Sequence, residues 1–327
     1  MDKFDADFYI QGVLQGQRRI IAKTITLLES TLPDHRKIAA RVMEGILPHT
    51  GRSVRLGITG VPGVGKSTFI ENLGLDLAEK GHRVAVLAVD PSSRRSGGSI
   101  LGDKTRMEKL ACHENTFIRP SPSGDTLGGV AAKTREIMLV CEAAGYDIVF
   151  VETVGVGQSE TSVAFMVDFF LALMIAGAGD ELQGIKKGVL EVADALAINK
   201  ADGDNRQRAE KARQDYEIAL HMVSPDSPNW RPPVLCCSSV VKNGTENVWE
   251  TVLAHKKAMK QSGEFDEKRK KQALEWMWTL VYDGLKVRFR ENTRVAAEIP
   301  QIAAKVEKEV ISPSAAAEML LSMESES

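Results

Sequence analysis

The strongest constraint on the fold is one eight-residue segment, Gly60-Val61-Pro62-Gly63-Val64-Gly65-Lys66-Ser67. It fits the phosphate-loop pattern G-x-x-x-x-G-K-[ST], follows an apolar run at 54–59 and precedes a helical pattern that opens at Lys66. Its glycines permit a backbone in which successive N–H groups point inward at a helix N-terminus and form a cradle for an anion. We therefore expect a strand–loop–helix unit in which Lys66 reaches the β- and γ-phosphates, Ser67 ligates Mg²⁺ and Thr68 lies by the α-phosphate.

Short apolar runs alternate with helical stretches after this segment. The runs lie at 54–59, 84–89, 116–119, 148–152, 169–175, 195–199 and 234–236. Continuous hydrophobicity indicates strands buried on both faces, and the intervening helices indicate βαβ crossovers. The sequence therefore predicts an α/β fold, with a doubly wound, mostly parallel sheet at 51–264.

The two ends of the chain have a different pattern. Residues 1–50 have helical spacing, with a break at Leu32-Pro33-Asp34 and a second helix to about 47, and predict an N-terminal helical extension. Residues 265–327 predict a C-terminal helical arm, with helices near 266–292 and 299–310 and a last one opening at Ser312-Pro313. Its apolar stripe needs a surface, supplied by the main domain or by a second copy of the chain.

Base selection is predicted by a second motif, Asn199-Lys200-Ala201-Asp202, which follows the apolar run 195–198. The Asp202 carboxylate can accept hydrogen bonds from the N1–H and N2–H₂ edge of guanine, whereas adenine has no matching donor pair. We expect Asn199 to bond the base or a loop, and the Lys200 stem to cover the ring. The next strand is followed by Ser238-Ser239-Val240, whose N–H groups are expected to touch the guanine O6. Taken by itself, N-K-x-D also suits a helix-capping turn.

Magnesium requires further oxygen ligands besides Ser67 and the phosphates. Asp90 and Glu152 each end a predicted strand, where ligands collect in such sheets. The segment 152–155 has Glu where many GTPases have the Asp of D-x-x-G, and Gly155 is expected to donate its N–H to the γ-phosphate. A helix cap is the other interpretation of Asp90.

A polar, charged loop at 91–106 is typical of a nucleotide-sensing segment. Asp103 is expected near the metal or the attacking water, and Arg106 or Arg94 near the developing phosphate charge. For any one of these residues a solvated surface loop is an alternative. Gln158 is a candidate for orienting water. With Lys66, Asp103, Arg106 and Gln158 as the catalytic set and no evident base, we expect slow hydrolysis that a partner accelerates.

Composition argues against several other classes of protein. The formal net charge of -2 supplies no overall positive field for nucleic acid or an anionic membrane. The longest apolar run, 163–178, is interrupted by Asp168 and is too short to span a bilayer, and the first residues do not resemble a secretory signal. The four cysteines have no C-x-x-C spacing, so reduced thiols in a cytoplasmic protein are expected.

These motifs, with V-D-P-S-S at 89–93 and E-T-V-G-V-G-Q-S-E at 152–160, resemble the MeaB/ArgK group of G-protein chaperones for adenosylcobalamin-dependent methylmalonyl-CoA mutase. The resemblance covers nearly the whole chain. It implies a GTP- and Mg²⁺-dependent homodimer held partly by the C-terminal arm, which gates delivery of adenosylcobalamin to the mutase and protects or rescues that enzyme. It also implies that Lys186 and Lys187, in a glycine-rich stretch at 177–188, respond to the partner.

Three alternatives remain. A metallochaperone GTPase of the same fold class usually carries a Cys/His cluster, and here Cys112-His113 is the only adjacent pair. A P-loop kinase acting on a small molecule needs an acceptor pocket and no guanine-reading motif. A scaffold with an inactive nucleotide site predicts no turnover, even with its partner.

Overall fold

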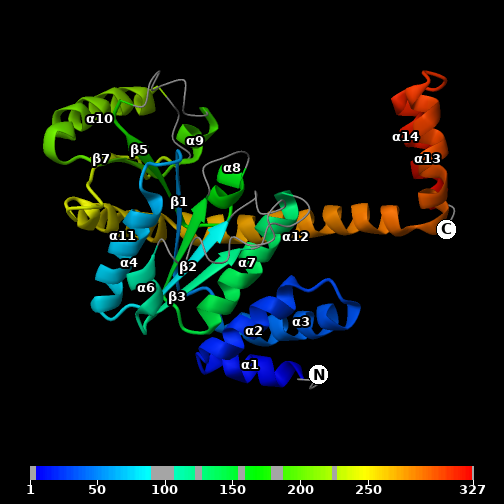
Figure 1. The fold of residues 1–327 in the computed structure, drawn as a ribbon, viewed down its shortest axis with the longest axis horizontal. Coiled ribbons are helices and arrows are strands. Elements are labelled where there is room, and N and C mark those ends of the chain that lie inside the picture. Colours follow the sequence, from blue (N-terminus) through cyan, green and yellow to red (C-terminus); the bar gives the residue numbers. More distant parts are fainter. Residues whose placement is uncertain are drawn as a thin grey trace. The chain divides into compact units, whose positions relative to one another are not determined.

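The computed structural model describes residues 5–89, 107–121, 127–153, 159–177, 187–222 and 227–325. In these residues seven parallel strands form one sheet in the order β3-β2-β4-β1-β5-β6-β7 (Figure 1). The strands are β1 (Val54–Gly60), β2 (Val84–Val89), β3 (Thr116–Ser121), β4 (Ile148–Thr153), β5 (Phe169–Ile175), β6 (Ala195–Asn199) and β7 (Val234–Cys236). The predicted doubly wound parallel sheet is confirmed.

Alternate residues of each central strand face opposite sides of the sheet, and both sides are buried. On one side Leu56 and Ile58 of β1 pack with α4 (Lys66–Glu79), α6 (Glu108–Cys112) and α11 (Thr245–Ser262). On the other side the strands pack with α7 (Leu127–Ala143), α8 (Ser159–Ala164), α9 (Lys187–Val192) and α10 (Arg206–His221). Burial on both faces is why these strands have continuous rather than alternating hydrophobicity.

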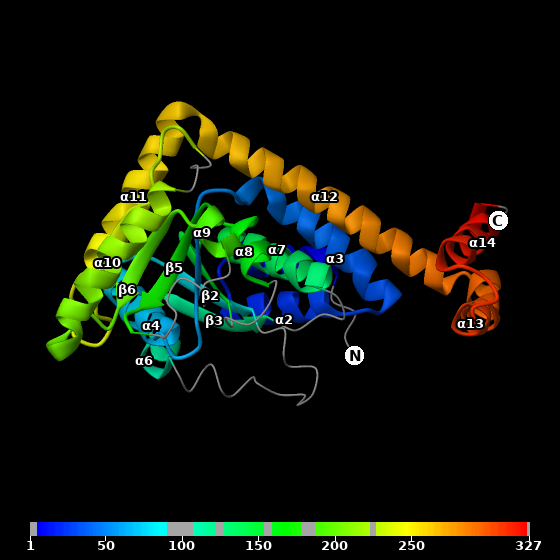
Figure 2. The same ribbon diagram turned by 90° about the horizontal axis from the view of Figure 1, so that it is seen from above.

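The N-terminal extension consists of α1 (Ala6–Leu14), α2 (Arg18–Glu29) and α3 (Pro33–Ile46), followed by the 3-10 turn η1 (Leu47–His49). These helices (blue) lie beside α7 in Figures 1 and 2, and Ile21 and Ile25 share one core with Ile137. Apolar spacing across 8–28 predicts one continuous helix, which is wrong. The chain breaks between α1 and α2 at Gly16, whose φ of 68° belongs to the left-handed region that glycine adopts without strain.

The chain divides into two compact units, residues 1–272 and 273–327. Helix α12 (Glu264–Glu291) begins in the first unit, and the second unit contains its remainder with α13 (Thr293–Glu307) and α14 (Pro313–Ser325). Asn292 caps α13 by accepting from the N–H groups of Arg294 and Val295, and Ser312 accepts from Ala315 at the start of α14. The predicted opening of the last helix at Ser312-Pro313 is therefore confirmed. The predicted domain limit at 264/265 stays a prediction.

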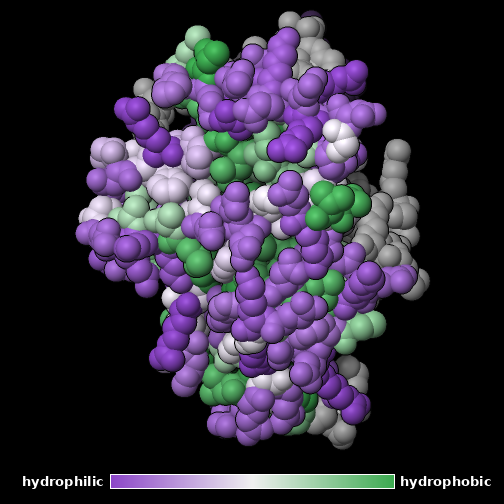
Figure 3. All heavy atoms as spheres, turned by 90° about the vertical axis from the view of Figure 1, so that its left-hand side faces the viewer, coloured by the Kyte–Doolittle hydropathy of each residue, from purple (hydrophilic) through white to green (hydrophobic). Residues whose placement is uncertain are grey.

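No helix among the described residues is long and apolar enough to cross a lipid bilayer. Figure 3 shows that the face bearing α10 and α11 is mainly hydrophilic, with separate hydrophobic groups.

Candidate functional site: a phosphate loop joined to a base-reading loop

The phosphate loop follows the central strand β1 and ends in the first turn of α4, as the motif predicts. Gly60, Gly63 and Gly65 have φ values of 148°, 79° and 99°. A Cβ on Gly60 would lie 2.4 Å from the carbonyl oxygen of Leu173, and one on Gly65 would lie 2.8 Å from Asn199 Nδ2. The glycines therefore permit both the backbone turn and its close approach to β5 and β6.

Lys66 and Ser67 occupy the positions that the motif assigns to phosphate and metal. Lys66 Nζ donates to the carbonyl oxygens of Gly60, at 2.7 Å, and Val61, at 3.3 Å, so its ammonium group lies over the loop. Ser67 Oγ donates to Glu152 Oε1 at 3.1 Å, and Glu152 is buried in β4. A hydroxyl and a carboxylate side by side at the end of the phosphate loop are oxygen donors of the kind that Mg²⁺ selects. Ser67 and Glu152 thus fit the predicted metal position.

Asn199 links the two halves of the site. Its Nδ2 donates to the carbonyl oxygen of Val64 at 2.8 Å, and its Oδ1 accepts from the N–H of Ser239 at 3.1 Å and from Ser239 Oγ at 2.9 Å. Both loops are therefore tied to one amide at the end of β6. Of the two roles expected for Asn199, base contact or loop contact, the structure shows loop contacts.

Asp202 lies beside the loop at 237–243, because its carboxylate accepts a hydrogen bond from Ser238 Oγ. Ser238 and Ser239 are buried, whereas Val240 is 74% exposed. Lys200 is exposed and has a φ of 60°, which is uncommon for a residue with a side chain and is found at functional turns. The two segments predicted to read the base, 199–202 and 238–240, thus meet the end of the phosphate loop at the carboxyl ends of the strands.

Several predicted residues cannot be placed in this arrangement. Asp90, Arg94, Asp103, Arg106, Gly155, Gln158 and Lys186 lie outside the described residues, as does the side chain of Lys187. Their predicted roles stay predictions. Among the residues that the structure does describe, no group of three or more His, Cys, Asp or Glu side chains is placed to hold a metal ion.

All four cysteines are free thiols, and Cys237 lies beside Asn199. Its Sγ lies 3.7 Å from Asn199 Oδ1. Burial raises the pKa of Cys237 to about 12, so the group packs there as a neutral thiol.

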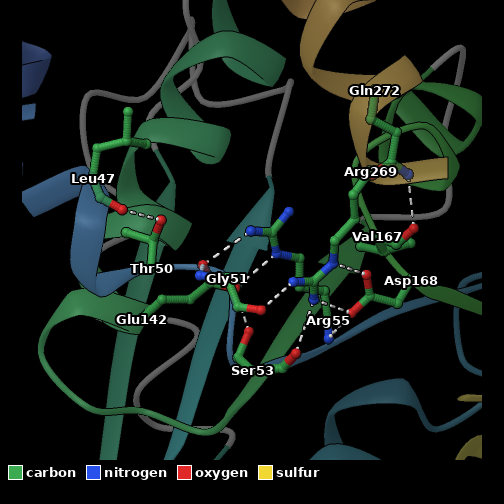
Figure 4. A network of polar contacts seen from close by, with 10 residues as sticks. All are labelled: Leu47, Thr50, Gly51, Ser53, Arg55, Glu142, Val167, Asp168, Arg269 and Gln272. Carbon is green, nitrogen blue, oxygen red and sulfur yellow. Dashed lines mark hydrogen bonds and ion pairs between the residues drawn. The ribbon is translucent and has the colours of Figure 1, made fainter. Parts of the chain in front are cut away.

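A buried ionic cluster that sequence reasoning missed lies at the opposite end of the sheet, where the central strands begin (Figure 4). Arg55 at the start of β1 makes two hydrogen bonds to Glu142 at the end of α7, of 2.8 and 2.9 Å. Burial disfavours the charged carboxylate, but the hydrogen bonds from Arg55, Ser53 and Gly51 lower the pKa of Glu142. The available signal was Asp168, a charged residue inside an otherwise apolar run.

Arg269 of α12 joins this cluster to the start of β5. Its guanidinium donates to both carboxylate oxygens of Asp168 and to the carbonyl oxygens of Gly51 and Ser53. Gln272 donates to the carbonyl oxygen of Val167 at 2.9 Å. The first turns of α12 are therefore fixed to the sheet by side chains that the helical pattern alone does not reveal.

Comparison with known proteins places this chain in a family. Residues 21–294 match the family model described as methylmalonyl-CoA mutase-associated GTPase MeaB. The chain is 52% identical to the GTPase ArgK of Escherichia coli, over 82% of this chain and 81% of the relative. It is 44% identical to the mouse methylmalonic aciduria type A homolog, a mitochondrial protein, over 95% and 77% of the two chains.

A solved structure, titled LAO/AO transport system kinase, is 39% identical and covers 99% of this chain and 98% of its own, with a TM-score of 0.78. The fold of this relative therefore agrees with the sequence comparison. The chain belongs to the MeaB family, the GTPases associated with methylmalonyl-CoA mutase.

Proposed function

We propose that the protein is a magnesium-dependent GTPase that controls delivery of adenosylcobalamin to methylmalonyl-CoA mutase and protects or rescues that enzyme. The observation that carries the GTPase assignment is the arrangement around Asn199. Its amide holds the phosphate loop through Val64 and the 237–243 loop through Ser239, with Asp202 beside the second loop. These contacts support the proposal because the phosphate loop and the carboxylate expected to read guanine lie at the same end of the sheet.

The chain's own residues do this chemistry mainly by position and charge. The N–H groups of the phosphate loop and the Lys66 ammonium would stabilise the negative charge that the phosphates carry and develop. Ser67 and Glu152 would hold Mg²⁺, which supplies further neutralisation of that charge when bound. Asp202 accepts from the guanine N1–H and N2–H₂ groups, so a bound adenine leaves a carboxylate without its donors.

The partner is proposed from the names of relatives. The family model names an association with methylmalonyl-CoA mutase, and the mouse relative is named for methylmalonic aciduria. We expect hydrolysis to be slow in the isolated protein and faster with an adenosylcobalamin-dependent acyl-CoA mutase, because a partner can complete the catalytic residues.

A homodimer is the second part of this proposal. Helix α12 exposes an apolar and aromatic surface that includes Leu274, Trp278, Tyr282 and Leu285, with the Trp278 and Tyr282 rings stacked at 6.0 Å. A large exposed surface of this kind suits a second copy of the chain. Light scattering tests this: Trp278→Glu combined with Tyr282→Glu should halve the mass, and an unchanged mass would contradict the role of this surface.

The decisive test is product analysis of GTP turnover with and without the mutase. Release of GDP and free phosphate, increased by the mutase, supports the proposal. Lys66→Ala should remove most of the affinity for the γ-phosphate while leaving the thermal unfolding transition in place. Turnover that the mutase does not change would contradict the partner assignment, and GTP affinity that survives Lys66→Ala would contradict the site.

One observation favours a different reaction, because the solved relative is titled a kinase. A kinase would transfer the γ-phosphate to an acceptor instead of to water. The same product analysis separates the two functions, since a phosphorylated acceptor in place of free phosphate would establish transfer.

A further inference from the structure

Helix α4 and its C-cap contact the loop after β7 and the first turn of α11 through three residues at four-residue intervals, Asn72, Asp76 and the cap residue Lys80. Residues four apart lie on one face of a helix, so the three form a line along it. Asn72 Nδ2 donates to the carbonyl oxygen of Ser239. The other two form ion pairs further along, Asp76 with Lys242 at 2.6 Å and Lys80 with Glu246 at 2.9 Å.

The three contacts differ in how much each contributes to fixing the loop. The Lys80–Glu246 pair is largely exposed, and the Asp76–Lys242 pair is half-exposed. Ion pairs in such surroundings contribute little because water and salt screen them. Asn72 is half-buried and bonds a backbone carbonyl of Ser239, a residue that is only 3% exposed. Of the three, the Asn72 contact is the one that fixes the backbone.

That contact acts on one particular peptide group. The carbonyl of Ser239 and the N–H of Val240 belong to the same peptide, and the described residues contain no cis bond. In a trans peptide the C=O and N–H point in opposite directions within one plane. Holding the Ser239 carbonyl toward α4 therefore turns the Val240 N–H away from α4. The N–H on the other side of Ser239 is already engaged by Asn199.

We propose that Asn72 is a positioning residue for base recognition, which orients the Val240 N–H as the hydrogen-bond donor for the guanine O6. This rests on the proposed GTPase function and adds a residue to it. Asp202 reads the N1–H and N2–H₂ edge of the base, and Asn72, through Val240, sets the donor for the remaining polar atom of that edge. Because α4 begins in the phosphate loop, the same helix fixes the geometry at both ends of the nucleotide.

The test uses an isosteric substitution and an altered base. Asn72→Asp keeps the shape of the side chain but removes both N–H donors and places a carboxylate against the Ser239 carbonyl. Dissociation constants are measured by titration for GDP and for 6-thio-GDP, in which sulfur, a weak acceptor, replaces O6. Lys80→Ala, at the C-cap of the same helix, is the matched control.

We expect Asn72→Asp to weaken GDP about tenfold and to leave 6-thio-GDP within about twofold of the wild type, because the lost contact is one that the sulfur analogue barely makes. Lys80→Ala should change neither constant by more than about twofold. Equal losses for the two ligands would show that Asn72 only stabilises the loop, and this would overturn the proposal. Wild-type protein that binds both ligands equally would also overturn it.

A second variant and a test of nucleotide binding by the wild-type protein complete the experiment. If Asn72→Asp lowers the thermal unfolding temperature so far that titration fails, Asn72→Ser replaces it, since a serine hydroxyl is too short to reach the carbonyl without a rearrangement and adds no charge. If the wild-type protein binds neither GDP nor GTP, the proposed function itself is wrong. An effect confined to Asn72→Asp tests only the role of Asn72.

Discussion

The guanidinium of Arg269 and the carboxylate of Asp168 form a two-pronged pair, with Nε–Oδ1 at 2.8 Å and Nη2–Oδ2 at 2.7 Å. The Asp168 side chain is only 4% exposed, and Phe265 covers the guanidinium with its ring centroid 4.6 Å away. Two parallel bonds between buried, planar groups fix the orientation of both partners. The pair therefore fixes the first turns of α12 to the start of β5.

Removing Arg269 should destabilise the protein strongly. Arg269→Ala leaves the Asp168 carboxylate buried without this partner, and we expect a loss of about 3–5 kcal/mol in the free energy of unfolding. Urea unfolding followed by circular dichroism measures it. The control is Lys270→Ala, an exposed neighbour whose ion pair with Glu267 should contribute less than about 1 kcal/mol. Equal stability of the two variants would contradict the anchoring role.

Asp202→Asn should change which base the site accepts. An amide can donate to the C2 oxygen of xanthine, whereas it cannot accept from both donor groups of guanine. We expect the preference for GTP over xanthosine triphosphate to fall by at least about a hundredfold, as measured by competition titration. Asp204→Asn, an exposed acid of the same turn, is the matched control and should keep the wild-type preference. Guanine preference that survives in Asp202→Asn would show that this carboxylate does not read the base.

Gly65 and Gly63 allow a test of the link between the phosphate loop and Asn199. Both have positive φ, so an alanine at either site incurs a similar backbone cost of about 1–2 kcal/mol. Only the Cβ at position 65 meets Asn199 Nδ2, at 2.8 Å, while position 63 has open space within 4 Å. Gly65→Ala should therefore lose at least about tenfold more GTP affinity than Gly63→Ala. Equal losses would mean that the link does not depend on this close approach.

His255 predicts a loss of stability in mild acid. It is buried between Trp230 and Phe169, and burial lowers its pKa from the ordinary 6.5, although Asp194 at 3.5 Å opposes this effect. Above pH 6.5 the imidazole is neutral in both the folded and the unfolded state, so it does not change the free energy of unfolding. As the pH falls below 6.5 the unfolded chain takes up the proton first, so stability decreases until the pH passes the lower, folded pKa.

Thermal unfolding between pH 7.5 and 5.0 measures this effect. His255→Gln should flatten the curve below pH 6.5, since glutamine does not titrate. Glu142 acts in a separate window, because its lowered pKa makes its contribution disappear only as the pH falls below the ordinary 4.5. A slope between pH 6.5 and 5.0 that persists in His255→Gln would assign it to other groups.

Local sequence patterns were enough to predict the sheet. All seven predicted runs begin at the first residue of a strand, and four of them also end at its last residue: 84–89, 169–175, 195–199 and 234–236. The phosphate loop and the positions of Asn199 and Asp202 follow from their places at strand ends. The break at Gly16 was missed because apolar spacing continues on both sides of it.

Contacts between distant parts of the chain could not be predicted in this way. Arg269 and Gly51 are 218 residues apart, and no local pattern pairs them. Asn72 lies within an ordinary helical stretch. Nothing in the local sequence indicates that its side chain contacts Ser239, 167 residues later. The roles expected for Asp103, Arg106 and Gln158 stay predictions.

The double use of the Asn199 amide limits how this site can diverge. A substitution there would disturb the phosphate loop, held at Val64, together with the loop after β7, held at Ser239. Asp202 contacts the second loop through Ser238, so a substitution there can change the proposed base preference while the Asn199–Val64 contact stays in place. An engineered nucleotide switch in this protein should therefore leave Asn199 unchanged and vary its neighbour three positions later.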